Sequence, residues 1–409
     1  MNILFVVPYM PNLVRTRPFN LIRHLSLRGN QVTVLTLWTS EQERAQLDQL
    51  KQLCHEVIAL PMPLWRSLLN SALALPSRRP LQSVFSWRPE LVATLNGRSP
   101  YDVIHVEHLR GSRYGLYLKQ NTGLPVVWDS VDCITHLFRQ ASVESKNALA
   151  RIRSRFELGR TEYYEGWLMD KFEHIVVTSP ADRTAMLDLG QNKAGVKPIS
   201  VLGNGVDIEH FCPDTAATRC QDTLVISGKM SYHANVTMVL HLFREIMPRV
   251  WAERPEIKLY VVGKDPRREI QALAEHPNVT VTGTVEALPP YLQSATIAVA
   301  PIQYGAGIQN KVLEAMACAT PVVTTTQALS ALQVTPDRDL MVADNPEGYA
   351  AAILELLANR EKRNVLGRNG RTYVETHHHW PNVAAKLEDI YRQVVASSKK
   401  HSRVRWANS

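Results

Sequence analysis

The chain has 409 residues, of which 45% are hydrophobic and 21% are charged. This balance excludes a disordered chain, a collagen-like chain and an array of coiled coils, and the length predicts two or three domains. Basic side chains number 46 and acidic ones 38, giving a formal net charge of +8. That excess favours anionic partners such as phosphate-bearing ligands or a membrane surface, whereas no zinc-finger spacing or aromatic RNA-binding signature indicates nucleic acid.

No apolar run reaches the ~18–20 residues that a membrane-spanning helix needs. The apolar start Asn2–Val7 has no basic region before it and is ended by Pro8. It is therefore expected to be a first β-strand and not a signal peptide. Five scattered cysteines without a CxxC pair are expected to be reduced thiols, which favours a cytoplasmic protein.

Short apolar runs alternate with helical patterns through the first half. Pro18–Arg28 places Leu21 and Leu25 on one face and is followed by Gly29, which indicates a helix. Such alternation predicts a parallel sheet with helices on both faces. The expected strands are Ile3–Val7, Val32–Leu37, Val57–Leu60, Val103–Val106, Pro125–Trp128 and Ile175–Thr178.

The second half repeats this rhythm after a junction rich in turn residues, Gly190–Asp214. Domains are expected over 1–200 and 201–382, and a last helix within 383–409 could cross back onto the first domain. The expected strands are Thr223–Ser227, Lys258–Val262, Val279–Thr282, Ile297–Ala300, Pro321–Thr325 and Leu340–Ala343. The expected helices are Val236–Trp251, Ile308–Ala317, Glu347–Asn359 and Val383–Val395.

Ligands of open α/β sheets bind beyond the carboxyl ends of the strands, so the residues after each strand are the candidates. The loop after the first strand, Pro8–Arg15, has no GxGxxG pattern, and a dinucleotide-dependent dehydrogenase is poorly supported. The stretch 300–323 is more informative, because a strand, a loop with Gly305 and Gly307, and a helix follow one another. Loop glycines let backbone N–H groups approach a phosphate, and the helix start adds partial positive charge.

Two charged residues stand out near these strand ends. Glu314 is the only charged residue between Val312 and Val323; it either binds the hydroxyls of a ribose diol or faces solvent on an amphipathic helix. Lys229 follows Gly228 directly after a strand. It either neutralises a diphosphate or is an ordinary surface lysine.

The chain resembles the GT-B glycosyltransferases, in particular the large retaining family four of nucleotide-sugar-dependent enzymes. The resemblance covers essentially the whole chain and rests on residues 313–323 (LEAMACATPVV), 203–207 (GNGVD) and 228–229 (GK), with looser support from 2–8 and 259–264. It implies an α/β fold of two Rossmann-like doubly wound domains that face a central cleft. It further implies that the second domain binds the donor and that the acceptor enters from the first.

Individual residues take their expected roles from this resemblance. Glu314 matches the second Glu of the family's E-x7-E motif and would hold the donor's ribose, while Lys229 stands where the family usually places Arg on the diphosphate. Asn204 and Gly205 would line the cleft at the hinge. The implied donor-binding residues are Gly228, Lys229, Tyr304, Gly305, Ala306, Gly307, Ile308, Gln309 and Glu314.

Two positions depart from the family pattern. The first Glu of the motif falls on Ala306, and the second basic residue falls on Ala234. Compensation could come from Gln303, Tyr304, His233 or Lys311.

In the first half, Asp129 stands where the family often carries a His, and Asp132 follows it. These carboxylates either orient an acceptor hydroxyl and stabilise charge at the anomeric carbon, or they cap the next helix. Asp129 therefore joins Lys229 and Glu314 as a candidate catalytic residue. The candidates for the acceptor side or the cleft are Arg15, Arg17, His108, Asp132, Asn204 and Gly205, and structural or surface roles remain open for Arg15, Arg17 and His108.

No DxD-like pair follows a strand of the second half, and the histidines of His377–His379 would point in different directions on a helix. We therefore expect no obligatory metal and no cofactor besides the nucleotide-sugar substrate.

The sequence thus predicts a glycosyltransferase that uses a nucleotide-diphosphate sugar and a lipid-linked or surface-polysaccharide acceptor; retention is implied by the resemblance alone. Leu64–Trp87 mixes aromatic, aliphatic and basic residues, as does the basic tail 399–406. Both fit reversible contact with the inner face of an anionic membrane, although Leu64–Trp87 fits ordinary packing equally well and the tail could instead be a frayed end. A soluble small-molecule acceptor, a nucleotide-sugar 2-epimerase on the same fold and a non-catalytic nucleotide-sugar-binding partner remain open alternatives.

Overall fold

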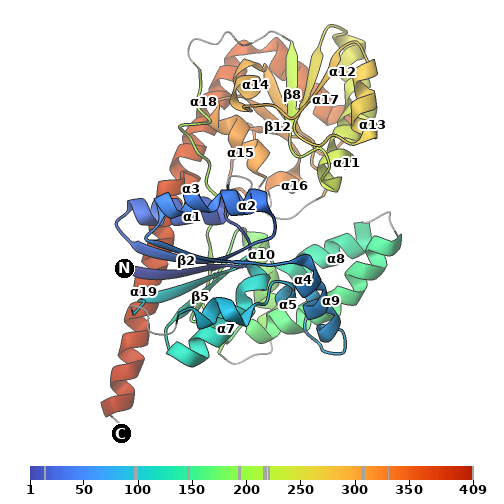
Figure 1. Ribbon diagram of the computed structural model, residues 1–409. Helices are drawn as coiled ribbons and strands as arrows, with labels where there is room; N and C mark the ends of the chain where they lie inside the picture. The colour runs from blue at the N-terminus through green and yellow to red at the C-terminus, as the bar shows by residue number, and fades with distance from the viewer. Residues whose placement is uncertain are drawn as a thin grey trace. The chain divides into compact units, whose positions relative to one another are not determined.

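The computed structural model describes residues 1–409 except 13–14, 96–99, 145–147, 192–194, 215–218, 220–221, 305–308, 330 and 408–409; for 141–144, 148–154 and 400–407 it describes the backbone alone. The chain divides into two compact units (Figure 1). Unit 1 comprises Met1–Gly203 together with Trp380–Ser409, and unit 2 comprises Asn204–His379.

Unit 1 is built on a seven-stranded sheet in the order β3-β2-β1-β4-β5-β6-β7, and all of the paired strands are parallel. Because the chain changes direction across the sheet between β1 and β4, the carboxyl ends of these two strands form a topological switch point. The last strand, β7, has three residues and was not predicted. The strands are β1 (Asn2–Val7), β2 (Gln31–Trp38), β3 (Glu56–Pro61), β4 (Val103–Glu107), β5 (Val126–Val131), β6 (His174–Val177) and β7 (Ile199–Val201).

Helices cover both faces of this sheet. On one face, Leu21 and Leu25 of α1 share a hydrophobic cluster with Leu387 and Tyr391 of α19, so the last helix packs beside the first (Figure 1). The other face is covered by α7, α9 and α10, whose apolar side chains join a second cluster. The helices of unit 1 are α1 (Thr16–Leu27), α2 (Glu41–Ala45), α3 (Leu47–Leu53), α4 (Leu64–Ala74), α5 (Leu81–Phe85), α6 (Pro89–Ala93), α7 (His108–Thr122), α8 (Ile134–Glu144), α9 (Ala148–Leu168), α10 (Pro180–Gly190) and α19 (Trp380–Ala407).

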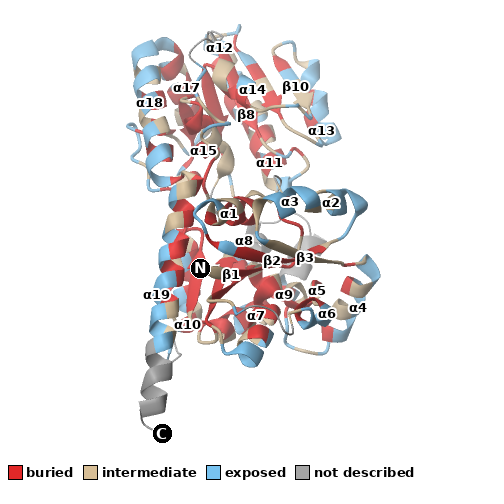
Figure 2. Cartoon of the chain, turned by 60° about the vertical axis from the view of Figure 1, so that its left-hand side comes forward, coloured by how far each residue is buried: buried red, intermediate tan, exposed pale blue. Residues whose placement is uncertain are grey.

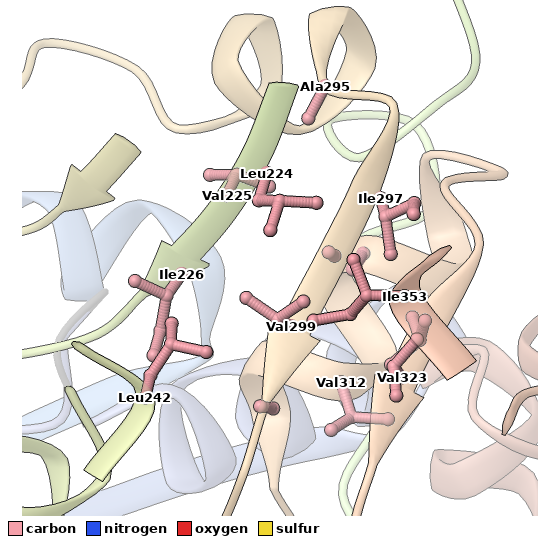
Figure 3. Packing of buried hydrophobic residues seen from close by; sticks show 14 of the residues in the cluster. Leu224, Val225, Ile226, Leu242, Ala295, Ile297, Val299, Val312, Val323 and Ile353 are labelled. Atoms are coloured by element: carbon pink, nitrogen blue, oxygen red, sulfur yellow. The ribbon is translucent and has the colours of Figure 1, made fainter. Parts of the chain in front are cut away.

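Unit 2 contains a six-stranded parallel sheet in the order β10-β9-β8-β11-β12-β13. Its switch point lies between β8 and β11. Val299 and Val323 of neighbouring strands pack with Ile353 of the covering helix α17 (Figure 3). The strands are β8 (Thr223–Ser227), β9 (Lys258–Val262), β10 (Val279–Gly283), β11 (Ile297–Ala300), β12 (Val322–Thr324) and β13 (Met341–Val342).

The predicted helix Val236–Trp251 is interrupted by one π-helical turn, η1 (Leu242–Ile246). Pro248 lies two residues beyond that turn, lacks a backbone N–H and would clash with the carbonyl group four residues earlier in a regular helix. The wider turn therefore accommodates the proline. The other helical elements are α11 (His233–His241), α12 (Met247–Glu253), α13 (Arg268–Gln271), the 3-10 turn η2 (Ala272–Glu275), α14 (Pro289–Ser294), α15 (Asn310–Ala317), α16 (Thr326–Leu329), α17 (Pro346–Ala358) and α18 (Arg360–His377).

Both sheets have the strand order of a doubly wound fold, which confirms the predicted fold class. All twelve predicted strands are present, with ends shifted by a few residues. Over the described ranges, no helix has both the length and the apolar character needed to cross a membrane.

Candidate active site

The switch point of unit 2 brings together residues from two loops that are far apart in the sequence. Lys229 follows β8, and Tyr304 follows β11. The Tyr304 hydroxyl lies 2.8 Å from Nδ1 of His233, the first residue of α11, and the two rings are stacked. Burial of the imidazole, with a smaller effect from Arg267, lowers the pKa of His233. The pair therefore joins the loops after β8 and β11 through a neutral imidazole.

The loop that carries Lys229 is held by close backbone packing. Gly228 and Gly263 follow β8 and β9, and a Cβ atom on Gly263 would lie 1.7 Å from the Gly228 carbonyl oxygen. The side chain of Asn235 donates to the carbonyl oxygen of Lys229 at 3.0 Å. The backbone of this loop is thus fixed, whereas the Lys229 side chain remains 55% exposed, with Asp265 4.0 Å from its Nζ.

Helix α15 presents Lys311 and Glu314 one turn apart on one face. Both side chains are half-buried, and Lys311 Nζ donates to Oε1 of Gln309 at 3.1 Å. Burial raises the pKa of Glu314 to about 7 and lowers the pKa of Lys311 to about 8. The predicted donor residues Gly305, Ala306, Gly307 and Ile308 lie outside the described residues.

Asn204 and Gly205 open unit 2 and lie beside His378, the residue after α18. The Asn204 carbonyl oxygen lies 2.7 Å from Nδ1 of His378, and the backbone N–H of Val206 donates to the His378 carbonyl oxygen at 2.6 Å. The two segments at the ends of unit 2 are therefore tied together. His378, the middle member of His377–His379, is buried.

At the carboxyl edge of unit 1, Arg17 and Asp129 form a buried ion pair. The Arg17 guanidinium donates through Nε and Nη2 to one Asp129 carboxylate oxygen, at 3.0 and 2.7 Å, and through Nη1 to the carbonyl oxygen of Leu202 at 2.9 Å. Asp129 is 0% exposed and Arg17 is 4% exposed. In this arrangement Asp129 orients Arg17 and has no surface through which to contact a sugar.

Further groups surround this ion pair. The Asp129 carboxylate accepts from the backbone N–H of Val131 at 3.1 Å. Val131 has a φ of 68°, an unfavourable conformation for a β-branched residue, and it lies where the pairing of β5 with β6 shifts register. His105 in β4 lies 3.9 Å from Asp129 and 2.8 Å from the hydroxyl of Tyr391 in α19.

The switch point of unit 1 carries a second buried carboxyl group, that of Glu107. The Tyr9 hydroxyl donates to one oxygen of Glu107 at 2.8 Å, and the other oxygen has no hydrogen-bond partner among the described residues. Burial, with the nearby Asp129 charge, raises the pKa of Glu107 to about 8. The Arg15 guanidinium lies over the Tyr9 ring and pairs with Glu43 at 3.1 Å.

His108 and Asp132 occupy neighbouring strand ends. His108 begins α7 with a φ of 62°, and burial lowers its pKa to about 3, so the imidazole is neutral. Asp132 accepts from the Thr178 hydroxyl at 3.2 Å. Burial and the Asp182 carboxylate raise the pKa of Asp132 to about 6.

The contacts that Tyr9 makes with Glu107, and Tyr391 with His105, were not predicted, because they join residues far apart in the sequence. Glu107 was recognisable as a strand end, but its pairing with Tyr9 spans 98 residues of sequence. Among the described residues, no group of three or more His, Cys, Asp and Glu side chains is placed to hold a metal ion.

Comparison with known proteins finds two matching family models and similar solved structures. The model described as "Glycosyltransferase Family 4" matches residues 14–210, and the one described as "Glycosyl transferases group 1" matches 221–359. Sucrose-phosphate synthase from Thermosynechococcus elongatus superposes with a TM-score of 0.69 at 18% identity, over 97% of this chain and 99% of that one.

Two sequence relatives are transferases. The D-inositol 3-phosphate glycosyltransferase of Paenarthrobacter aurescens is 25% identical over 74% of each chain. A GDP-mannose-dependent monoacylated alpha-(1-6)-phosphatidylinositol monomannoside mannosyltransferase of Corynebacterium glutamicum is 26% identical over 46% of this chain and 55% of its own length.

The two doubly wound units define a protein of the GT-B class. The chain belongs to the group 1 glycosyltransferases of family four and is a transferase enzyme.

We predict that Arg17→Met lowers the free energy of unfolding by ~3–5 kcal/mol, because it leaves the Asp129 carboxylate buried without its partner. Urea denaturation measures the change. The double variant Arg17→Met/Asp129→Leu removes both charges and is expected to recover most of the loss. A double variant as unstable as the single one would contradict this account of the ion pair.

We predict that Glu107→Gln stabilises the protein more at pH 8 than at pH 5. The folded protein holds a proton on Glu107 up to a pKa of about 8, whereas the unfolded chain releases it near the ordinary value of 4.5. Between these values the wild type therefore loses stability as pH rises, and an amide that cannot ionise avoids that loss.

Thermal melts at the two pH values, with the exposed Glu361→Gln as a matched control, measure the effect. The Tm difference between Glu107→Gln and wild type should grow from pH 5 to pH 8. A difference that is constant with pH would contradict the assignment.

Proposed function

We propose that this transferase moves a sugar from a nucleotide-diphosphate donor to a lipid-linked or surface-polysaccharide acceptor at the cytoplasmic face of an anionic membrane, with retention of anomeric configuration. The bond from the anomeric carbon to the diphosphate oxygen breaks, and its electron pair goes to the diphosphate. The acceptor oxygen forms a bond to the same carbon, and the acceptor's proton leaves with the diphosphate. Membership of family four supports retention.

The observation that carries the donor assignment is the set of groups at the β8/β11 switch point. Lys229 is exposed on a loop with a fixed backbone. His233 and Tyr304 connect the loops after β8 and β11 through a hydrogen bond. Glu314 is half-buried on α15 at the same edge. Lys229 suits a diphosphate, and Glu314 suits a ribose diol. The name of the Corynebacterium relative, which specifies GDP-mannose, supports a nucleotide sugar.

The chain has its own positive groups for the leaving diphosphate. Charge develops on the diphosphate as the glycosidic bond breaks, and fixed positive groups placed beforehand stabilise that charge. Lys229 and the N-terminal end of α15 provide such groups. We therefore propose that transfer requires no metal and no further cofactor.

The acceptor assignment rests on an apolar stripe along α4, defined as Leu64, Trp65, Leu68, Leu69 and Leu73. Its side chains are 49–71% exposed, and their spacing puts them on one side of the helix. Helix α4 carries pale blue, exposed residues in Figure 2. Helix α4 begins three residues after β3 ends, and therefore close to the carboxyl edge of the unit 1 sheet. An exposed apolar stripe of this kind is typical of helices that lie in a membrane interface.

Basic residues follow the stripe. Arg78 and Arg79 are exposed, and the Arg78 guanidinium lies over the ring of Tyr163 on α9, itself 55% exposed. Positive charge next to an apolar helix face complements an anionic lipid surface, which is the partner to which we commit.

Trp87 has a different role from the stripe. Its ring lies 4.8 Å from that of Tyr114 and 4.2 Å from the Arg113 guanidinium, and it packs against the hydrophobic core. The interpretation of Leu64–Trp87 as ordinary packing therefore holds at Trp87, whereas the α4 stripe remains available to a membrane.

The function is tested by incubating the purified protein with UDP- and GDP-sugars and with lipid-linked acceptors in buffer containing EDTA. We expect one donor to yield a glycosylated acceptor, detected by mass spectrometry, with the anomeric configuration of the donor by NMR. Turnover without an acceptor would indicate an epimerase, and loss of turnover in EDTA would contradict metal independence.

We predict that Glu314→Ala weakens binding of the active nucleotide sugar by ~1.5–3 kcal/mol, the range for a hydrogen bond to a charged group. The fold should survive because α15 keeps its apolar face. Calorimetry measures the affinity, and Glu361→Ala, at an exposed position of α18, is the matched control. Donor affinity equal to wild type would contradict the assignment of Glu314 to the donor.

We predict that the protein sediments with phosphatidylglycerol vesicles at low salt and that high salt releases it, because each Lys or Arg near such a surface contributes ~1 kcal/mol. The variant Trp65→Ser/Leu68→Ser/Leu69→Ser should lose this binding and keep its Tm, since these side chains are exposed. Leu27→Ser, which replaces an equally exposed leucine of α1, should still bind. Absence of binding at every salt concentration, together with turnover on a water-soluble acceptor, would overturn the membrane assignment.

A further inference from the structure

Lys311 occupies an unusual position for a lysine. It lies in the first turn of α15 and borders a small void, which is lined mainly by buried core residues and also by Ser227 of β8 and Ala300 of β11. These are the last residues of the two strands that flank the switch point of unit 2. Its place at the start of α15 therefore puts Lys311 near the carboxyl edge of the sheet, and its side chain is only partly exposed to solvent.

The charge of Lys311 is poorly compensated in this position. Its ammonium group donates to the neutral amide oxygen of Gln309 at 3.1 Å. Glu314, one turn further along the helix, acts on it through longer-range attraction, and burial still lowers its pKa to about 8. The first turn of a helix is moreover the positive end of the helix dipole, where a cation is disfavoured and an anion is stabilised.

The donor site has room for a second positive charge. In the family pattern a second basic residue follows the first by five positions, and that position here is Ala234, in the first turn of α11. Of the two basic positions in the pattern, this sequence keeps the first, as Lys229. Its Nζ lies 4.0 Å from Oδ2 of Asp265. A diphosphate that carries two or more negative charges would therefore be incompletely neutralised by Lys229 alone.

We propose that Lys311 is a second diphosphate-binding residue, which reaches the phosphates of the donor from α15 and replaces the basic side chain missing at position 234. This inference rests on the proposed function, because it assumes a nucleoside-diphosphate donor at the β8/β11 edge. Lys311 binds the diphosphate in the ground state and holds the same charge as the sugar leaves. Glu314 and Lys311, on one face of α15, then bind adjacent parts of one ligand, the ribose and the phosphates.

A role of Lys311 in ligand binding and a role in folding predict different effects of Lys311→Met on the Tm. Lys311→Met keeps a long flexible side chain for the void and removes the charge. If the lysine serves the ligand, the variant should have a Tm at least equal to that of wild type, because a poorly compensated half-buried charge is gone. If the lysine serves the fold, the Tm should fall.

Calorimetric titration with UDP or GDP, whichever binds wild type more tightly, is compared with titration of the matching nucleoside. We expect Lys311→Met to bind the nucleoside diphosphate at least tenfold more weakly and the nucleoside with unchanged affinity. Lys311→Arg should retain most of the diphosphate affinity. Lys258→Met, an exposed lysine at the start of β9, is the matched control and should bind as wild type.

The outcomes distinguish this inference from the proposed function. Wild type that binds neither nucleoside diphosphate, and transfers no sugar, would overturn the proposed function itself. Wild type that binds and transfers, while Lys311→Met retains its diphosphate affinity or loses diphosphate and nucleoside equally, would overturn the role of Lys311 alone.

Discussion

Every paired strand in each sheet runs parallel to its neighbours, and this constraint decides where polar chemistry lies in each unit. Parallel strands need a crossover after each strand, so all of the carboxyl ends meet at one edge and the loops that follow them converge there. In unit 2 this brings Lys229, Tyr304 and the start of α15 to the edge of β8 and β11, although 75 residues separate the first two in sequence. Without this shared edge, none of these side chains would belong to a common site.

The two edges use their polar residues differently. In unit 1 the polar groups contact one another inside the protein, since Arg17 pairs with Asp129 and Tyr9 donates to one oxygen of Glu107. Arg17 also holds the carbonyl oxygen of Leu202, just before the chain leaves unit 1. In unit 2 the side chain of Lys229 stays exposed and Glu314 is half-buried. Unit 1 thus has a rigid polar edge, whereas the edge of unit 2 leaves charged groups available for a ligand.

Periodic patterns located the strands because a buried parallel strand is a short apolar run with turn residues at its ends. Two features carried no such signal: β7, which has three residues between Pro198 and Gly203, and the π turn before Pro248. In the proposed site, Lys229 and Glu314 were predicted from their local neighbours together with the family resemblance, because the local pattern alone also fits surface residues. The pairing of Arg17 with Asp129 was not predicted, because it joins residues 112 positions apart and depends on how the folded chain brings the start of α1 to the end of β5. Local sequence reveals a strand end but not the partner that folding brings to it.

In the donor site that we propose, electrostatics gives a reason why two departures from the family pattern are compatible with sugar transfer. Ala306 replaces a carboxylate and Ala234 replaces a basic residue, so these two departures together leave the net charge of the pattern unchanged. Lys311 then makes the edge more positive by one charge, and it does so from a helix start whose dipole has the same sign. Such an excess of positive charge disfavours the empty site and favours a ligand with at least two negative charges, which is the charge of a diphosphate. The same excess lessens the need for a metal ion as the leaving group departs. Under the proposed function, recognition of the transferred sugar without the first motif carboxylate falls to other groups at this edge; Tyr304, which contacts His233, stands two positions before Ala306 in the sequence.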